Sequence, residues 1–383
     1  MLDGAVNCIE LMHKQEKKMA ILSNTSSPSY VAKQRLSKYG LREELFVGGL
    51  VSSGEECAKY IRQHYCRSSS SRSSSRSSSR SSSRSSSSSD TSKKKKALWF
   101  TWKESEKQNP MQFLTHCEED YNDDGGRRHQ SSSGEVIMID IATSVDEADF
   151  ILLHGSEVWR RCRDITDSSK KSSSAEEEDD DVMIVDLKFL FDEDYRVVDE
   201  LLQEAANKRL PMICANPDLI VGLPNGVVGN MPGKIANRYE HKMGGTVHHF
   251  GKPNPRHFHS CLDNLGMKSF DVDSKIYGVA HVGDSLHHDV VGANAAGIDS
   301  IFVLGGIHAK ELGLSATGTD GHSGGIVIVD SRDPEREEEE GKSYVTKADL
   351  TAKLNVLFDD AGVYPTHVVP CLSLGDGWMI RKL

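Results

Sequence analysis

The sequence lacks several patterns that would assign a chain to a class at once. Its eight cysteines are scattered and include no C-x-x-C pair, which argues against structural zinc and suits a reducing compartment. No apolar run approaches the roughly 20 residues that a membrane helix needs, and no signal peptide follows Met1. We therefore expect a cytoplasmic protein without a membrane span, with organelle targeting left open if an N-terminal segment is missing.

Positive charge is also scarce. The chain has 46 lysines and arginines against 57 aspartates and glutamates, so its formal net charge is −11. A general nucleic-acid-binding protein would favour the opposite sign, so the composition gives no support to a nucleic-acid partner. Much of the negative charge lies in two runs, 176–181 and 335–340, which we interpret as solvated linkers.

One long segment has no apolar side chain. Residues 67–96 contain almost only serine, arginine and lysine, and such a segment cannot offset the entropy lost on ordering. We expect disorder there and in the second polar break, 167–181. The alternative is an Arg/Ser tract that contacts RNA. Single arginines punctuate serine triplets in this tract, which favours repeat expansion within a loop; these are Arg72, Arg76, Arg80 and Arg84.

The rest of the chain alternates short apolar runs with amphipathic helical patterns. This alternation is typical of βαβ units and parallel sheets. The middle of the chain, 67–246, therefore looks like a second α/β unit inserted into a first one formed by 1–66 and 247–383. The expected strands lie at 19–22, 45–51, 135–142, 150–153, 182–187, 211–215, 247–250, 276–282 and 300–304, and the clearest helices at 54–65, 195–208 and 347–358.

The most informative segment is 282–297. Asp284 lies two residues after the apolar run 276–282, and Asp289 lies five residues further on. A helical pattern then continues to Gly297. This order predicts Asp284 at the carboxyl tip of a buried strand and Asp289 in the first helical turn. Ligands bind at such tips in open α/β sheets, and two carboxylates suit a hard cation such as Mg²⁺. A helix start with two acidic capping residues is the alternative.

Histidines are frequent near this segment, and neutral imidazoles bind zinc and iron. No H-E-x-x-H or facial-triad spacing is present, however. We interpret these histidines as loop and helix-surface residues; they are His248, His249, His257, His259, His281, His287 and His288.

Three signals occur in a fixed order along the chain. Ser23-Asn24 follows an apolar strand, Lys252 follows the next core strand beyond the insertion, and Gly283-Asp284 leads to Asp289. The series resembles motifs two, three and four of the haloacid dehalogenase superfamily of phosphohydrolases. More narrowly, it resembles the class IIA branch, with an α/β cap inserted between motifs two and three. Local matches lie at 21–24, 147–152, 214–218, 251–253 and 292–299. The resemblance implies a Rossmann-like parallel-sheet core with an inserted α/β cap domain.

The resemblance also implies a role for each motif residue. In this superfamily an aspartate attacks phosphorus, and water then hydrolyses the aspartyl-phosphate. Ser23 would hydrogen-bond a phosphoryl oxygen with help from the amide of Asn24, and Lys252 would place a point charge between nucleophile and phosphate. Asp284 would ligate Mg²⁺, and Asp289 would support the metal or orient Lys252.

Two cap residues, Asn216 and Asp218, would face the substrate. Taken singly, each of these signals also has an ordinary interpretation. Ser-Asn after a strand caps helices, a loop lysine is usually solvated, and Asn216 and Asp218 can form a turn with Pro217.

The family's first motif, a strand ending in the nucleophilic aspartate, has no match. Asp3-Gly4 imitates its end, but Asp3 lies only 20 residues before Ser23, and Met1-Leu2 cannot make a strand. We expect the chain to be N-terminally truncated, with residues 1–12 corresponding to the segment just downstream of motif one.

The sequence therefore predicts a phosphatase of a small phosphorylated metabolite that works through an aspartyl-phosphate and Mg²⁺ and is inactive as given. Two alternatives remain, a non-catalytic protein that binds phosphate ligands and an RNA-associated protein that uses the Arg/Ser tract. The resemblance also allows a homodimer through the cap. The cap loops set the substrate, which the sequence does not identify.

Overall fold

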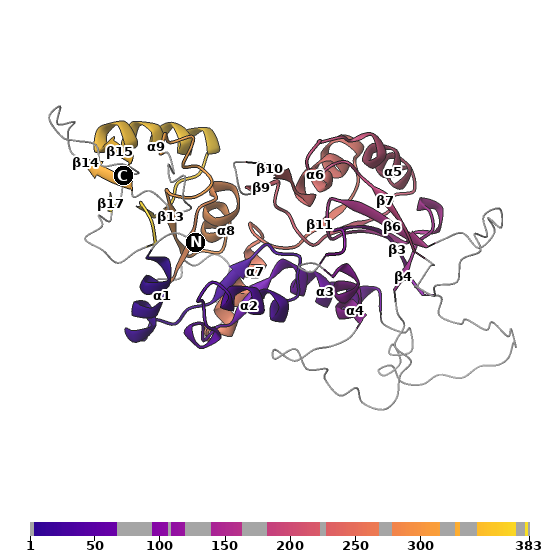
Figure 1. Ribbon diagram of the computed structural model, residues 1–383, viewed down its shortest axis with the longest axis horizontal. Coiled ribbons are helices and arrows are strands. Elements are labelled where there is room, and N and C mark those ends of the chain that lie inside the picture. The colour runs from indigo at the N-terminus through magenta and orange to yellow at the C-terminus, as the bar shows by residue number, and fades with distance from the viewer. Residues whose placement is uncertain are drawn as a thin grey trace, which may run out of the picture. The chain divides into compact units, whose positions relative to one another are not determined.

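The structure is a computed structural model. It describes residues 4–66, 94–105, 109–118, 139–162, 182–222, 227–267, 278–314, 326–329, 343–372 and 380–381. These residues form two compact units (Figure 1). The first comprises Met1–Ser23, Val31–Val51 and Gly251–Leu383, and the second Asn24–Tyr30 and Ser52–Phe250. Both units combine helices with parallel strands, so the fold is the predicted mixed α/β class.

The division between the units differs from the predicted domain limits at both ends of the insertion. Helix α3 (Ser53–His64) packs on α4 (Pro110–Glu118) and so falls in the second unit, although the sequence placed it in the core. Strand β11 (Val247–His249), predicted as a core strand, pairs with β8 (Met212–Cys214) of the second unit. Its three residues, Val-His-His, carry too little pattern to indicate which sheet they join.

The two predicted disordered segments lie outside the described residues, with one exception. Lys94 and Lys95 are described, and Lys96 opens strand β3, so the predicted disorder extends too far at this end. Lys96 pairs in the sheet because the apolar run Ala97–Phe100 follows it directly.

The second unit is built on one mixed sheet with strand order β11-β8-β5-β3-β6-β7. From β11 to β3 the neighbouring strands are parallel, and β6 and β7 follow antiparallel. Short β4 adds a parallel pair at the start of β3. The remaining bounds are β3 (Lys96–Thr101), β4 (Asp140–Ile141), β5 (Phe150–Leu153), β6 (Val158–Cys162) and β7 (Val182–Asp186).

Helices cover both faces of this sheet (Figure 1). Along β3, Leu98 and Phe100 pack with α5 (Arg196–Asn207) and α6 (Pro232–Met243), whereas Ala97 and Trp99 pack with α3 and α4. A strand buried on both faces needs apolar side chains at every position, which is why β3 and β5 appear as continuous apolar runs.

A small antiparallel hairpin, β9 (Ile220–Gly222) and β10 (Val228–Asn230), also belongs to the second unit. It lies between β8 and α6 in the chain and pairs with no other described strand.

The first unit contains a four-stranded sheet with order β12-β13-β16-β17. Strands β12, β13 and β16 are parallel, and β17 is antiparallel to β16. Helix α9 (Lys347–Ala361) packs on this sheet through an apolar cluster that includes Leu354, Phe358 and Phe302. The other bounds are β12 (Ala280–Gly283), β13 (Asp299–Val303), β16 (His367–Val369) and β17 (Ile380–Arg381), with β14 (Ile326–Val329) parallel to β15 (Ser343–Thr346).

The first unit also holds a separate two-stranded sheet, β1 (Ile21–Ser23) with β2 (Leu50–Ser52). Helix α7 (Pro255–Asn264) contacts β1, and one apolar cluster joins α7 to α8 (Val291–Ala295), Leu22 and Val279. The remaining helices are α1 (Ala5–Lys14) and α2 (Ser29–Ser37). No helix of the described ranges is long and apolar enough to cross a membrane.

Strands β1 and β12 differ from their prediction as buried strands. Both are only half-buried, and Val282 is 36% exposed. The physical reason is pairing, because each of the two strands has a hydrogen-bonded neighbour on one side only among the described strands.

Candidate active site

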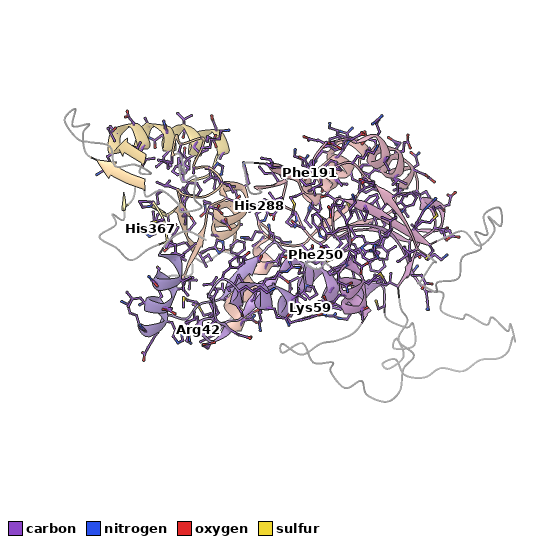
Figure 2. The ribbon with its side chains drawn as sticks, in the orientation of Figure 1. Arg42, Lys59, Phe191, Phe250, His288 and His367 are labelled. Atoms are coloured by element: carbon purple, nitrogen blue, oxygen red, sulfur yellow. The ribbon has the colours of Figure 1, made fainter. Side chains whose placement is uncertain are left out.

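The turn after β12 brings Asp289 back to the end of its own strand. Ser285 caps the turn by accepting a hydrogen bond from the His288 amide at 3.2 Å, and His288 is labelled in Figure 2. Asp289 lies in the first helical turn, as predicted, and its Oδ2 accepts from the amides of Asp284 (3.1 Å) and Ser285 (3.0 Å). A Cβ at Gly283 would lie 2.2 Å from Cγ of Asp289, so glycine makes this return possible.

The other oxygen of Asp289 has two side-chain partners. Oδ1 lies 2.7 Å from Nζ of Lys252 and 2.8 Å from Nε2 of His281. Burial by itself raises the pKa of the Asp289 carboxyl, but the Lys252 ammonium and the His281 hydrogen bond hold that pKa well below its usual range. Asp289 is therefore a buried carboxylate with four donors. This geometry supports the orientation of Lys252, one of its two predicted roles.

Asp284 follows β12 at its carboxyl end and is half-buried. Its Oδ2 accepts from the amide of Ile307 at 3.0 Å, and a Cβ at Gly306 would lie 2.1 Å from Cβ of Asp284. Within the described part of the chain, Oδ1 of Asp284 accepts no hydrogen bond, so this oxygen can serve as a ligand.

The described residues meet one requirement of a Mg²⁺ site, because they include a carboxylate that can act as a ligand. No group of three or more His, Cys, Asp or Glu that could hold a metal ion occurs among the residues that the structure describes. Mg²⁺ does not need such a group, because it binds through one or two carboxylates and takes its other ligands from water and phosphate. Asp284 supplies one suitable carboxylate.

Three other predicted residues meet in the second unit. Nδ2 of Asn24 donates to Oδ1 of Asp218 at 2.8 Å, and the amide of Asp218 donates to Oδ1 of Asn216 at 2.9 Å. Asn24 and Asn216 are buried. The Asn216-Pro217-Asp218 segment is thus the turn of the ordinary interpretation, and the same turn also holds Asn24.

The loop that carries Asn24 is fixed to the second unit by side chains. The hydroxyls of Ser52 and Ser53 donate to the carbonyl oxygens of Ser27 and Thr25, both at 2.9 Å. Nε1 of Trp102 donates to the hydroxyl of Ser26 at 3.0 Å. Sequence reasoning missed these anchors. The cap of α3 is Ser52, whose hydroxyl accepts from the Glu55 amide at 3.1 Å. The sequence suggests a capping box at Ser53 and Glu56, one residue too late, and the S-x-x-E pattern of Ser52 and Glu55 is the signal that could have found the true cap.

Ser23 ends β1 at its carboxyl end, as the sequence predicted, and belongs to the first unit. The structure therefore brings together Lys252, Asp284 and Asp289 in the first unit, and Asn24, Asn216 and Asp218 in the second. Ser23 and Asn24, although consecutive, fall on different sides of the division.

Two histidines depart from the surface interpretation. His281 contacts Asp289 and lies edge-on to Phe258, with ring centroids 4.9 Å apart, and His257 is buried in α7. Nothing in the spacing of these residues separates them from solvent-facing histidines, so their burial was not predictable.

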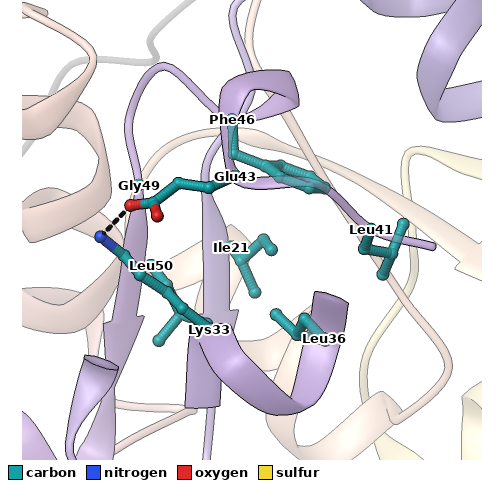
Figure 3. Close-up of a pocket in the computed structure, with 8 residues that line it drawn as sticks. All are labelled: Ile21, Lys33, Leu36, Leu41, Glu43, Phe46, Gly49 and Leu50. Atoms are coloured by element: carbon teal, nitrogen blue, oxygen red, sulfur yellow. Dashed lines mark hydrogen bonds and ion pairs between the residues drawn. The ribbon is translucent and has the colours of Figure 1, made fainter. Parts of the chain in front are cut away.

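The first unit also contains a small cavity of about 20 Å³ lined by Ile21, Leu36, Phe46 and Leu50, with Lys33 and Glu43 paired beside it (Figure 3). It lies at the amino ends of β1 and β2, whereas the predicted site residues follow carboxyl ends. A volume of this size holds about one water molecule. The cavity is therefore separate from the candidate site.

The fold and the first-unit site define a Rossmann-like α/β protein whose carboxylates follow the carboxyl end of a parallel strand. Residues 249–322 match the model of the HAD-hydrolase-like family. Comparison with curated protein sequences gives no match.

Solved structures of similar fold include a possible sugar phosphatase of the HAD superfamily from Cytophaga hutchinsonii. It is 16% identical over 98% of this chain and 89% of that chain, with a TM-score of 0.52. A p-nitrophenyl phosphatase from Archaeoglobus fulgidus is 17% identical over 96% and 88%, with a TM-score of 0.47. A haloacid dehalogenase-like hydrolase from Brucella suis is 18% identical over 80% and 79%, also with a TM-score of 0.47.

The match over residues 249–322 agrees with the predicted resemblance to the haloacid dehalogenase superfamily in that part of the chain, and the solved structure from Cytophaga hutchinsonii shows that the fold is similar.

Proposed function

We propose that this chain carries the phosphoryl-transfer site of a class IIA phosphatase that acts on a small phosphorylated metabolite with Mg²⁺. The observation that carries the proposal is the first-unit site. There a buried carboxylate, Asp289, holds the Lys252 ammonium at 2.7 Å, while the neighbouring Asp284 keeps one oxygen available. Phosphoryl transfer depends mostly on positioning and charge neutralisation, and a fixed lysine beside a ligating carboxylate supplies both.

Each residue has a defined part in this proposal. Lys252 neutralises charge on the phosphate and the nucleophile, and Asp289 keeps its ammonium in place. Asp284 would hold Mg²⁺, which neutralises phosphoryl charge when bound. Ser23 and the amide of Asn24 would bind phosphoryl oxygens, and Asn216 and Asp218 would contact the remainder of the substrate.

The proposal also includes a nucleophilic aspartate on a strand of the family's first motif, for which the sequence shows no match. Strands β12 and β1 each have an unpaired edge among the described strands. Helix α7 packs against Leu22 of β1 and against Val279, which directly precedes β12. An additional apolar strand parallel to β12 would bury Val282, which is 36% exposed. A carboxylate at its carboxyl end would lie at the same edge as Asp284.

The test compares two forms of the protein on p-nitrophenyl phosphate with Mg²⁺. We expect background hydrolysis from the chain as given, and turnover once it is extended at its N-terminus by an apolar strand ending in D-x-x-G. Asp284→Asn should abolish that turnover. Turnover by the unextended chain that Asp284→Asn removes would show that the nucleophile is already present. An extended, folded chain that neither binds Mg²⁺ nor turns over would contradict the proposed function.

The lack of a match to the first motif favours a second function, namely non-catalytic binding of phosphate ligands. Lys252 and Asp284 can bind a phosphate and its cation without any covalent step. Calorimetric binding of methylphosphonate with Mg²⁺ by the chain as given, with no gain of turnover on extension, would favour this function.

A further inference from the structure

His281 lies in the candidate site, although none of the predicted motifs includes it. It belongs to β12 and precedes Asp284 by three residues. Residues two apart on a strand share a face, so His281 lies on the face of Gly283, where a Cβ would be 2.2 Å from Cγ of Asp289. The His281 side chain is only 14% exposed, so strand geometry places it against Asp289 and away from solvent.

The imidazole ring of His281 is held by two contacts. Its Nε2 lies 2.8 Å from Oδ1 of Asp289, and the ring meets that of Phe258 edge-on with centroids 4.9 Å apart. Phe258 is itself buried in α7 against Gly292, where a Cβ would lie 2.3 Å from Cε2 of the phenyl ring. A hydrogen bond to a carboxylate and an edge-on aromatic contact together fix the orientation of the imidazole.

The charge of Asp289 decides the direction of this hydrogen bond. Burial raises the pKa of the Asp289 carboxyl, but the Lys252 charge and the His281 hydrogen bond hold that pKa well below its usual range. The carboxyl group is therefore ionised, and an ionised carboxylate only accepts hydrogen bonds. Nε2 of His281 must carry a proton and donate to Oδ1.

The acceptor positions of Asp289 are all occupied. Its Oδ1 accepts from Nζ of Lys252 at 2.7 Å and from Nε2 of His281. Its Oδ2 accepts from two backbone amides, at 3.1 Å and 3.0 Å. A carboxylate has about four lone-pair sites, so a cation could bind Asp289 directly only by displacing one of these donors. Asp284, in contrast, keeps Oδ1 available among the described residues.

The two side-chain partners of Oδ1 differ in stiffness. Lys252 reaches Oδ1 from the loop before α7 on a flexible four-carbon stem, whereas His281 is a ring fixed by its neighbours. The imidazole donor therefore fixes Oδ1, and Oδ1 in turn fixes the ammonium. A cationic group that is already in place loses less entropy when it binds an anion. Loss of the imidazole donor should weaken phosphate binding at Lys252.

We propose that His281 is a positioning residue of the phosphate site, whose Nε2–H group fixes Asp289 so that Asp289 holds the Lys252 ammonium ready for a phosphoryl group. Asp289 is then committed to Lys252, and Mg²⁺ is left to Asp284. All four residues belong to the first unit. This inference rests on the proposed function, since it requires that Lys252 bind phosphate.

The test measures two affinities of the full chain by calorimetry, that for Mg²⁺ alone and that for methylphosphonate with Mg²⁺. Glutamine and methionine form a matched pair at position 281. Nε2 of glutamine can replace the imidazole donor, and methionine has a similar length but no N–H group. We expect His281→Met to weaken methylphosphonate binding about tenfold, the scale of a lost hydrogen bond to a charged group, and His281→Gln to stay within about twofold of the unmodified chain. Neither variant should change the affinity for Mg²⁺.

His259→Met is the control. His259 is a half-buried histidine of α7 whose Nε2 lies 3.4 Å from the carbonyl oxygen of Ala296, outside the phosphate site, so this variant should change neither affinity. Thermal unfolding of all three variants shows whether each is folded. A measurement on the unmodified chain needs no folded methionine variant. Imidazole ¹⁵N NMR, assigned with His281→Gln, should show a proton on Nε2 of His281.

The outcomes separate the two proposals. If methylphosphonate binds and the methionine and glutamine variants bind it equally well, or if Nε2 of His281 is unprotonated, the positioning inference is wrong and the proposed function stands. An equal loss of Mg²⁺ affinity in His281→Met would place the effect at the metal and would also overturn the inference. If the folded, unmodified chain binds neither ligand, both proposals are wrong.

Discussion

Asp289 connects four groups in the candidate site. Its carboxylate joins a lysine from the loop before α7, a histidine of β12 and two backbone amides. Because it is buried, replacing it leaves the Lys252 ammonium without its counter-charge in a partly desolvated place. The residue therefore has a structural role that is measurable without any enzyme activity.

We predict that Asp289→Asn lowers the free energy of unfolding by about 2–3 kcal/mol, the usual value of hydrogen bonds to a charged group. Asp284→Asn is the control. Asp284 accepts a single amide hydrogen bond from Ile307 and is half-buried, so its change should cost less than about 1 kcal/mol. Urea unfolding of both variants measures the difference, and equal losses would contradict the assignment of Asp289 as the anchor.

Titration of the Glu55 carboxyl makes the free energy of unfolding depend on pH. Burial raises the pKa of this carboxyl, but the His116 hydrogen bond and the charges of His116, Lys59 and Arg62 lower it to about 2. A lowered folded-state pKa stabilises the fold above the unfolded pKa, about 4.3, and this contribution is lost as the pH falls towards 2.

We expect Glu55→Gln to be less stable than the unmodified chain by at most about 3 kcal/mol at pH 5, with the gap closing as the pH falls towards 2. Denaturant unfolding at a series of pH values tests this. A gap that stays constant between pH 5 and pH 2 would show that Glu55 titrates normally in the folded protein.

At the scale of single residues, the sequence indicated candidate site residues but not all their contacts. The order of Ser23, Lys252 and Asp284 is informative because each follows an apolar run, and strand ends collect ligand residues. His281 was not predictable, since it occupies an ordinary position on a strand. The contact from Asn24 to Asp218 joins residues 194 apart in the chain, and no local pattern reports such a distance.

Among the elements, the turn before β9 and the first turn of α6 are packed very closely. A Cβ at Gly233 would lie 2.1 Å from the carbonyl oxygen of Pro217 and 2.6 Å from that of Asp218. Alanine is about 1 kcal/mol better than glycine inside a helix, so any loss of stability at this position must come from the contact.

We predict that Gly233→Ala destabilises the protein by about 1–3 kcal/mol and weakens methylphosphonate binding, because it displaces the turn that holds Asn24. Gly222→Ala is the matched control, since a Cβ there meets nothing within 4 Å. Thermal unfolding with calorimetry measures both effects. If the Gly233→Ala variant is as stable as the unmodified protein, the turn at Pro217 and Asp218 can move away from the added methyl group without cost, and the prediction is wrong.

Continuous apolar runs were the most reliable guide to strands. Strands β5 and β8 were predicted in type and approximate place because both their faces are buried. Strand β3 was missed, although its residues Ala97–Phe100 form a continuous apolar run. Strand β11 was placed in the wrong unit, since the destination of a short strand depends on tertiary pairing and not on its own residues.

For the molecule as a whole, the described strands differ widely in burial. The middle residues of β3, β5 and β8 are fully buried, whereas β12 alternates between exposed and half-buried residues. The two compact units divide at 51/52 and 250/251, and not at the predicted limits 66/67 and 246/247, because α3 and β11 pack with the second unit.

Amide hydrogen exchange should reflect this difference. We expect the amides of β3, β5 and β8 to exchange at least about a hundredfold more slowly than those of β1 and β12, since exchange follows local opening. Extension by the proposed apolar strand should slow β12 and leave β3 unchanged. Equal protection in β3 and β12 of the chain as given would argue against an open edge.

The division into two units also has a covalent consequence. The backbone passes from one unit to the other at four peptide junctions, 23/24, 30/31, 51/52 and 250/251. Any reorientation of one unit against the other must be absorbed as torsion near these junctions. One of them is the peptide bond between Ser23 and Asn24, so the boundary between the units divides the two residues of the predicted second motif.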